Sequence, residues 1–359
     1  MTIGTQPTGP EMSRRQMVCR VLGGAAALAG TEQFPGLVPQ TSHASGARPL
    51  VFCWMHSGEP ASLASLRQHA SAITHLSPTW YSVREDLSIA GTLDQMVIDF
   101  ARHHGLSLHP AIGNTLTAAS AQFILGSAGA RARAAQNIAE LVLKQDFDGI
   151  NMDFEGNFGA YRDQYSDLMD ELARHLRPAG KWVTVDVPPN HPPSSWSAAY
   201  DYARLGQACD AVVLMAYDYS VQKPGSVSPL WWDRQAVGYA LKQIPPNKLV
   251  VGLPFFGRHW TEADGKFSGT PPLTHKEALD LLAWSGASVY RPALDATPRF
   301  SWSDGGTKHI VHFEDMQSLA VKLQSLDSRI RGAAFWRLGL EDGEQWNAIN
   351  SWVRRRLTG

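Results

Sequence analysis

Short apolar runs rich in β-forming residues alternate with helical stretches along most of this chain of 359 residues. The helical stretches, such as Ala132–Leu143, Tyr161–Leu176 and Met316–Leu326, carry apolar residues three and four positions apart. The candidate strands are Leu50–Met55, Ile73–Val83, Ser107–Ile112, Gly149–Glu155, Trp182–Val187, Ala211–Tyr217, Leu249–Phe255 and Gly332–Trp336. Repeated βα units form parallel sheets. Eight of them in about 300 residues predict a (β/α)8 barrel, the TIM barrel fold.

One segment, residues 259–313, interrupts this alternation between the seventh candidate strand and the helical stretch that follows it. It contains a helix-like stretch, a strand-like piece, a turn signal and a second strand-like piece: Lys276–Ala283, Arg299–Trp302, Asp304-Gly305-Gly306 and His309–Phe313. We therefore expect a small α+β insertion subdomain at residues 259–313. The catalytic barrel would then comprise residues 45–258 and 314–359.

The amino terminus has the features of an export signal. Ser13-Arg14-Arg15-Gln16-Met17 precedes a short, mildly apolar stretch, Val21–Gly30, and Ser42-His43-Ala44 offers small residues at the usual cleavage positions. This order resembles a twin-arginine export signal. We expect residues 1–44 to be that signal and the protein to be secreted or held in the cell envelope. The apolar stretch is too short for a membrane span, which needs roughly 20 residues.

The composition points to an uncharged partner. The formal net charge is -1, which gives no electrostatic reason to bind nucleic acid or an anionic membrane. The chain has 12 tryptophans, and flat amphipathic rings suit the apolar faces of sugars, although most of them should pack in the core. The 13 histidines show no metal-ligand spacing and no phosphate-binding glycine loop appears, so we expect neither a metal nor a cofactor.

Two cysteines, Cys53 and Cys209, lie beside predicted strands in the mature chain. A disulfide bridge between them is one reading. Two small buried thiols are the reading that we favour, because proteins exported by the twin-arginine route fold before export and need no bridge.

The run Asp148–Glu155 places polar groups along one side of a buried strand. Side chains alternate between the two faces of a strand, so Asn151, Asp153 and Glu155 share one face while apolar residues occupy the other. Neighbouring carboxylates raise each other's pKa, and burial raises both further, so one carboxyl group can remain protonated and act as a general acid. A strand whose end is merely solvated is the structural alternative.

These residues also carry a family resemblance. Phe147–Glu155 resembles the active-site signature of the family 18 glycoside hydrolases, the chitinase superfamily. Motifs that resemble the family's sixth, seventh and eighth strands follow in order: Met215-Ala216-Tyr217-Asp218, Gly252–Arg258 and Gly332–Trp336. The resemblance covers about residues 49 to 353. Within the superfamily, Phe335–Asp342 is most similar to the bacterial spore-lytic branch of N-acetylglucosaminidases.

The resemblance implies a role for several residues. Glu155 would be the general acid and base, while the 2-acetamido group of the substrate would act as the nucleophile. Asp153 would orient that group and stabilise its positive charge, and Tyr217 would bind its oxygen. Trp336 would form the floor of the sugar subsite. Tyr217 as an ordinary barrel residue and Trp336 as a core residue are the structural alternatives. Further candidate substrate-binding residues are Asn151, Met215, Asp218, Asn114, Tyr81 and Arg258.

Two positions depart from the commonest family pattern. Asn151 stands where many chitinases have Asp, and Phe256 where many have Tyr. Because Asn151 is neutral, we expect it to hydrogen-bond Asp153 without raising its pKa. Asp153 should then ionise more readily than it would with Asp at position 151, and its charge should help to keep Glu155 protonated.

The resemblance implies a secreted, monomeric, retaining glycosidase. It would hydrolyse β-1,4 bonds after N-acetylglucosamine in peptidoglycan, chitin or their fragments. A catalytically silent sugar-binding barrel is one alternative, although Glu155 is present. An endo-N-acetylglucosaminidase that acts on N-glycans is another. The sequence does not distinguish these substrates, nor endo from exo action.

Overall fold

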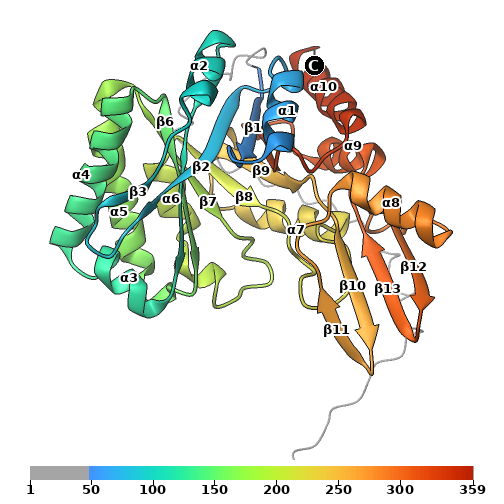
Figure 1. Ribbon diagram of the computed structural model, residues 1–359. Helices are drawn as coiled ribbons and strands as arrows, with labels where there is room; N and C mark the ends of the chain where they lie inside the picture. Colours follow the sequence, from blue (N-terminus) through green and yellow to red (C-terminus); the bar gives the residue numbers. More distant parts are fainter. Residues whose placement is uncertain (1–47, 359) are drawn as a thin grey trace, which may run out of the picture. The chain divides into compact units, whose positions relative to one another are not determined.

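The computed structural model describes residues 48–358, and within them eight parallel strands form a closed ring (Figure 1). In ring order these are β1 (Leu50–Met55), β2 (His75–Val83), β5 (Ala111–Leu116), β6 (Gly149–Gly156), β7 (Trp182–Val187), β8 (Ala211–Met215), β9 (Leu249–Pro254) and β14 (Gly332–Trp336). Pairing of β1 with both β14 and β2 closes the ring. The predicted (β/α)8 barrel is confirmed. The predicted export signal, residues 1–44, lies outside the described residues.

One predicted strand is two strands in the structure. Ser107–Ile112 is divided into β4 (Ser107–Leu108), which pairs only with β2, and β5, which begins at Ala111. Pro110 lies between them and has no backbone N–H to donate to a neighbouring strand. A further short strand, β3 (Ile89–Gly91), runs antiparallel to β2 at the edge of the ring.

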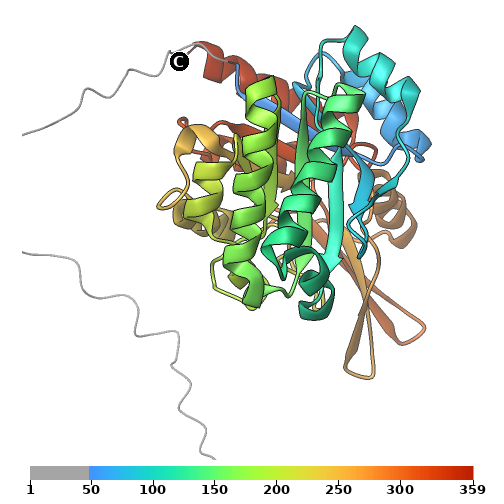
Figure 2. The ribbon, with the colours of Figure 1, turned by 90° about the vertical axis from the view of Figure 1, so that its left-hand side faces the viewer.

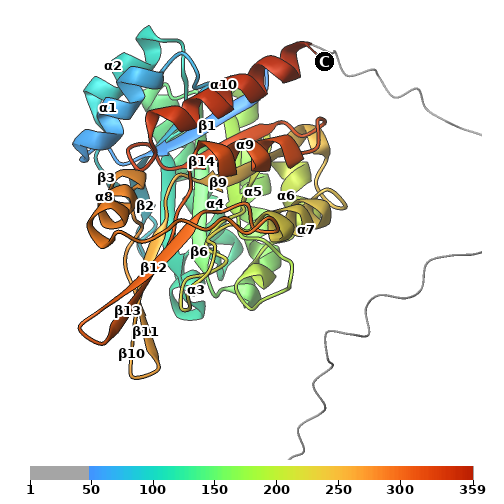
Figure 3. The ribbon, with the colours of Figure 1, turned by 90° about the vertical axis from the view of Figure 1, so that its right-hand side faces the viewer.

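Helices surround the ring of strands, as the front view and the two opposite side views show (Figures 1, 2 and 3). They are α1 (Pro60–His69), α2 (Gln95–His103), α3 (Ala118–Leu125), α4 (Ala128–Gln145), α5 (Arg162–Leu176), α6 (Tyr202–Ala208), α7 (Leu230–Ala240), α9 (Met316–Ser325) and α10 (Gly343–Thr358). The periodicity of α5 shows why they pack there, because Leu168, Leu172 and Leu176 bury one stripe of the helix. Among residues 48–358, no helix has the length and apolar character to cross a membrane.

Strands β1, β8 and β9 are buried along their whole length, so both of their faces are covered. Along β1, Val51, Cys53 and Met55 belong to the large cluster between strands and helices, while Phe52 and Trp54 belong to a second cluster inside the ring. This burial on both faces explains why these three strands are apolar throughout. Cys53 and Cys209 are both buried and unbridged, as predicted.

The insertion between β9 and α9 has its own sheet. Its elements are β10 (Arg258–Ala263), β11 (Lys266–Gly269), α8 (His275–Ser285), β12 (Arg299–Asp304) and β13 (Thr307–His312). The strands are antiparallel in the order β11-β10-β13-β12, and their hairpins extend beyond the barrel (Figure 1). One face packs against α8 through Ala278, Phe300 and Val311.

The sequence missed the β10–β11 hairpin of this insertion. The four residues of β11 are exposed, and only Trp260 of β10 is buried, so the pattern lacks an apolar face. The division of the chain at residues 44, 258 and 313 stays a prediction.

Candidate active site

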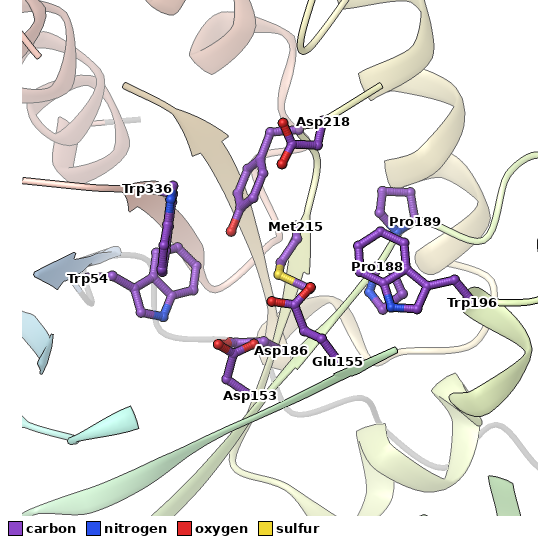
Figure 4. Close-up of a pocket in the computed structure, with 11 residues that line it drawn as sticks. Trp54, Asp153, Glu155, Asp186, Pro188, Pro189, Trp196, Met215, Asp218 and Trp336 are labelled. Carbon is purple, nitrogen blue, oxygen red and sulfur yellow. The ribbon is translucent and has the colours of Figure 1, made fainter. Parts of the chain in front are cut away.

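A hollow opens at the carboxyl ends of the barrel strands (Figure 4). Its lining comes from loops and strand ends that are far apart in the sequence: Trp54, Asp153, Glu155, Asp186, Pro188, Pro189, Trp196, Met215, Tyr217, Asp218 and Trp336. In a (β/α)8 barrel this end carries the functional groups. The fold therefore brings six of the sequence-predicted site residues together: Asp153, Glu155, Met215, Tyr217, Asp218 and Trp336.

Strand β6 aims its acids into the ring. Ile150, Met152 and Phe154 are fully buried against the helices, so the alternate residues point inward, as the sequence pattern predicts. Asp153 pairs in register with Gly113 of β5. On the other side β6 pairs with β7 up to Met152 and Val185, so the next pair in the same register is Asp153 and Asp186.

Asn151 lies beneath the pocket and does not line it. It is fully buried, and its Oδ1 accepts hydrogen bonds from Trp54 Nε1 at 2.9 Å and from Ser77 Oγ at 3.1 Å. Its Nδ2 donates to Thr184 Oγ1 at 3.2 Å and to Asp186 Oδ1 at 2.9 Å. The expected hydrogen bond to Asp153 is absent from this set. The amide group therefore ties four strands together beneath the acids.

The acids themselves hold protons more tightly than usual. Burial raises the pKa of Asp153 to about 8, with a further contribution from the charge of Glu155. Burial also raises the pKa of Glu155, and the charge of Asp218 adds to the effect. Burial therefore dominates the pKa of Asp153. That Asp153 ionises more readily with Asn than with Asp at position 151 stays a prediction.

Tyr217 and Asp218 follow β8 and line the opposite wall. A side chain at Gly252 of β9 would come within 3.3 Å of the Tyr217 ring, so the glycine makes room for that ring. Arg258 donates to Asp218 Oδ1 from Nη2 at 2.6 Å and from Nε at 3.1 Å. Arg258 is absent from the lining, so its contact with the site runs through Asp218.

Aromatic rings form the remaining wall. The Trp336 ring stands edge-on to Trp54 at 5.6 Å and to His56 at 5.8 Å between ring centroids. A second hollow of about 520 Å³ shares Asp153 and Trp336 with the first and is lined also by Tyr81. Tyr81 therefore lines the hollow that adjoins the one containing Glu155.

Asn114 is not part of either hollow. Its side chain exchanges two hydrogen bonds of 2.8 Å with the backbone of Val83, and it borders a separate depression with Arg84 and Asp86. The hydrogen bonds of its side-chain amide therefore join β5 to β2. The expectation that it binds substrate in this pocket has no geometric support.

Sequence reasoning missed Trp54, Trp196 and Asp186. Trp54 and Asp186 occupy strands whose bounds were predicted correctly, but which partner each strand side chain meets across the ring depends on the register. An acid at Asp186, in the otherwise apolar strand that ends before Pro188, was the available signal. Trp196 lies in an irregular loop with no periodic pattern.

Comparison with known proteins identifies the class. The family described as "Glycosyl hydrolases family 18" matches residues 54–341. The chain belongs to this family, and the protein is a family 18 glycoside hydrolase.

Three relatives show how the chain sits within the family. A cortical fragment-lytic enzyme of Bacillus subtilis is 28% identical over 63% of this chain and 54% of its own length, so the chain spans about half of that relative. An uncharacterized glycosylase, YvbX, of the same species is 25% identical over 82% of this chain and 88% of that protein. The predicted resemblance to spore-lytic enzymes is confirmed. A chitinase structure from Chromobacterium violaceum covers 85% of this chain and 99% of that chain with a TM-score of 0.78 and 24% identity, which supports the fold.

Proposed function

We propose that this glycoside hydrolase is a secreted, retaining N-acetylglucosaminidase whose substrate is peptidoglycan or its fragments. The observation that carries the proposal is the inward column of Asp153 and Glu155, both with raised pKa, facing Tyr217 and Trp336 across one hollow. The spore-lytic relative favours peptidoglycan over chitin as the polymer. The two adjoining hollows suit a chain of sugars better than a single one.

In the proposed reaction, Glu155 protonates the glycosidic oxygen as the bond from that oxygen to C1 breaks. The carbonyl oxygen of the substrate's acetamido group forms a new bond to C1, giving an oxazolinium ion. Asp153 accepts the acetamido N–H and Tyr217 donates to the acetamido oxygen. Water then attacks C1 from the face that the leaving group vacated, Glu155 takes a proton from that water, and the bond from C1 to the acetamido oxygen breaks, which restores the neutral acetamido group. Two inversions leave the anomeric configuration unchanged.

Trp336 would hold the apolar face of the sugar at the reacting centre. Its ring rests edge-on against Trp54, and Trp54 is fixed by its hydrogen bond to Asn151. These contacts fix the position of the Trp336 ring relative to the acids. Asn151 therefore acts through Trp54 rather than by touching the sugar.

The substrate is tested by offering three polymers to the purified protein: peptidoglycan, chitooligosaccharides and an N-glycoprotein. Mass spectrometry of the products identifies the sugar at each new reducing end. New ends at N-acetylglucosamine from peptidoglycan support the proposal. Products from chitooligosaccharides alone would instead assign a chitinase, and release of intact N-glycans an endoglycosidase. A folded protein that binds these sugars but yields no product would be a silent binding barrel.

Export is part of the proposal and has its own test. Replacing both Arg14 and Arg15 by Lys keeps the charge but removes the twin-arginine pair. We expect the unaltered chain in the extracytoplasmic fraction and the variant in the cytoplasm. Equal export of both would leave the glycosidase assignment intact and remove the twin-arginine route.

A further inference from the structure

Asp186 is an acid inside the barrel that the family signature on β6 does not include. It is buried, it lines the pocket, and it is the residue that follows the last β6–β7 register pair, next to Asp153. Neighbouring strands lie about 4.8 Å apart, so two inward side chains at paired positions meet. Figure 4 shows the carboxyl groups of Asp153 and Asp186 together beneath Glu155.

Each of these two carboxyl groups has one buried oxygen that accepts no hydrogen bond from the described residues. Asp186 Oδ1 accepts from Asn151 Nδ2 at 2.9 Å, whereas Asp186 Oδ2 is buried and finds no hydrogen-bond partner among residues 48–358. In the same part of the chain, Asp153 Oδ1 is also buried without a partner. Leaving two buried acceptors unpaired is costly, and a single proton between two carboxyl groups satisfies both.

The neighbours of Asp186 favour such sharing. The titratable groups that act on it or feel its charge are Asp153, Glu155, Tyr165, Tyr200 and Tyr217. None of these can supply a positive charge. Two negative charges at Asp153 and Asp186 would therefore face each other without compensation, and one of the pair keeps its proton.

Asn151 explains why the second carboxyl group lies on a different strand. Many chitinases have Asp at the position of Asn151, directly below Asp153 on β6. Here that position is an amide, and its Nδ2 donates to the carboxyl group of Asp186 on β7. The carboxyl group below Asp153 is thus absent from β6, and a carboxyl group is present on the neighbouring strand β7.

We propose that Asp186 is the positioning carboxylate of this site, sharing one proton with Asp153 and taking that proton when the substrate's acetamido N–H docks on Asp153. The proton moves from an oxygen of Asp153 to an oxygen of Asp186, so the charge of the pair stays at one negative unit. Asp153 becomes the charged member as positive charge develops on the acetamido group. The inference rests on the proposed function, because it needs an acetamido substrate.

The test is a relocation of the carboxylate. Asp186→Asn keeps the shape and an oxygen that can accept from Asn151, but it can no longer take a proton. The double variant Asn151→Asp with Asp186→Asn places the carboxyl group back on β6 and reverses the same hydrogen bond. Asp210→Asn is the matched control, since Asp210 precedes β8 and its Oδ2 accepts from Val183 N at the far end of β7.

Kinetics on an N-acetylglucosamine oligosaccharide that the wild type cleaves give the readout. We expect Asp186→Asn to lower kcat by about 30-fold or more with KM changed by no more than about threefold, since the loss is confined to the transition state. The double variant should recover to within about fivefold of wild-type kcat, and Asp210→Asn should match the wild type. Thermal unfolding of each variant confirms that it is folded.

The outcomes separate this inference from the proposed function. Near-normal kcat in Asp186→Asn, with the wild type active, overturns the inference alone. So does a folded double variant as slow as the single one. A wild type that cleaves no N-acetylglucosamine substrate overturns the proposed function and the inference with it.

Discussion

Two groups of acids in this molecule have different neighbours. Glu314 and Asp233 lie close to a buried cation, Lys322, whose Nζ donates to Glu314. Burial raises the pKa of both acids, and the charge of Lys322 opposes that rise. The pocket acids Asp153 and Glu155 have no such partner, because none of the described residues that line the pocket is Lys or Arg. Glu314 and Asp233 are fully buried, whereas Asp153 and Glu155 are part-buried at the pocket, so the two groups differ in solvent access as well as in charge compensation.

This difference separates a cluster whose groups hydrogen-bond one another from the acids of the candidate active site. The Lys322 cluster also includes Ser318 Oγ, which donates to Glu314 Oε2 at 2.6 Å, and it joins α9 to the end of the insertion. Its groups satisfy one another. Burial raises the pKa of the acids in both groups, but the pocket acids line a hollow, and Asp153 Oδ1 is buried without a hydrogen-bond partner among residues 48–358. Four substitutions test the distinction.

Glu155→Gln should have the largest effect on activity. The leaving group then departs without a proton, so we expect kcat to fall roughly 10²- to 10⁴-fold. Stability should hold or rise, because a part-buried carboxyl group becomes a neutral amide. Turnover and thermal unfolding measure the two effects, with Glu140→Gln on the exposed face of α4 as the control. Near-normal turnover in a folded Glu155→Gln protein would remove the general acid from the account.

Lys322→Met should have the opposite profile. Removing the cation leaves Glu314 buried and uncompensated, which costs about 3–5 kcal/mol of unfolding free energy. Turnover per folded molecule should be unchanged. Denaturant unfolding measures the loss, and adding Glu314→Gln should restore much of it. A loss below about 1 kcal/mol would mean that the pair is not what holds this region together.

Asp233→Asn addresses pH dependence. Burial raises the pKa of Asp233 from its ordinary value of 3.8 to about 7. The unfolded chain releases this proton first, so the contribution of Asp233 to stability is greatest below about pH 4 and declines as the pH rises to about 7, by up to about 4 kcal/mol. Asp233→Asn should flatten that part of the stability curve and leave turnover intact. Asp153→Asn should flatten the curve also, but with loss of turnover. Unfolding curves recorded from pH 4 to pH 8 check both, and an unaltered slope in Asp233→Asn would contradict the assignment.

Trp336→Ala should have the smallest effect of the four. The loss of an aromatic face at the sugar subsite should raise KM and lower kcat, each about tenfold. Trp284→Ala on α8 is the matched control, because that ring is 67% exposed and lies outside the pocket lining. Equal kinetic constants for a folded Trp336→Ala protein and the wild type would return Trp336 to a purely structural role.

The sequence predicted the barrel because several of its strands are apolar on both faces and its helices have a clear period. It also predicted that Asp153 and Glu155 share one face of their strand, because side chains alternate between faces every residue; their catalytic roles stay predictions. The contribution of Asp186 depends on the pairing of β6 with β7, which no local pattern encodes. The same limit applies to Asn151, whose partners Trp54, Ser77 and Asp186 come from three other strands.

The central claim is that the substrate's own acetamido group is the nucleophile at these acids. Proton NMR during the first turnovers of a β-linked N-acetylglucosamine oligosaccharide tests it directly. The account predicts the β-anomer as the first product, and no cleavage when the sugar at that subsite lacks its N-acetyl group. An α-anomer as the first product, or equal cleavage of the de-N-acetylated sugar, would contradict it.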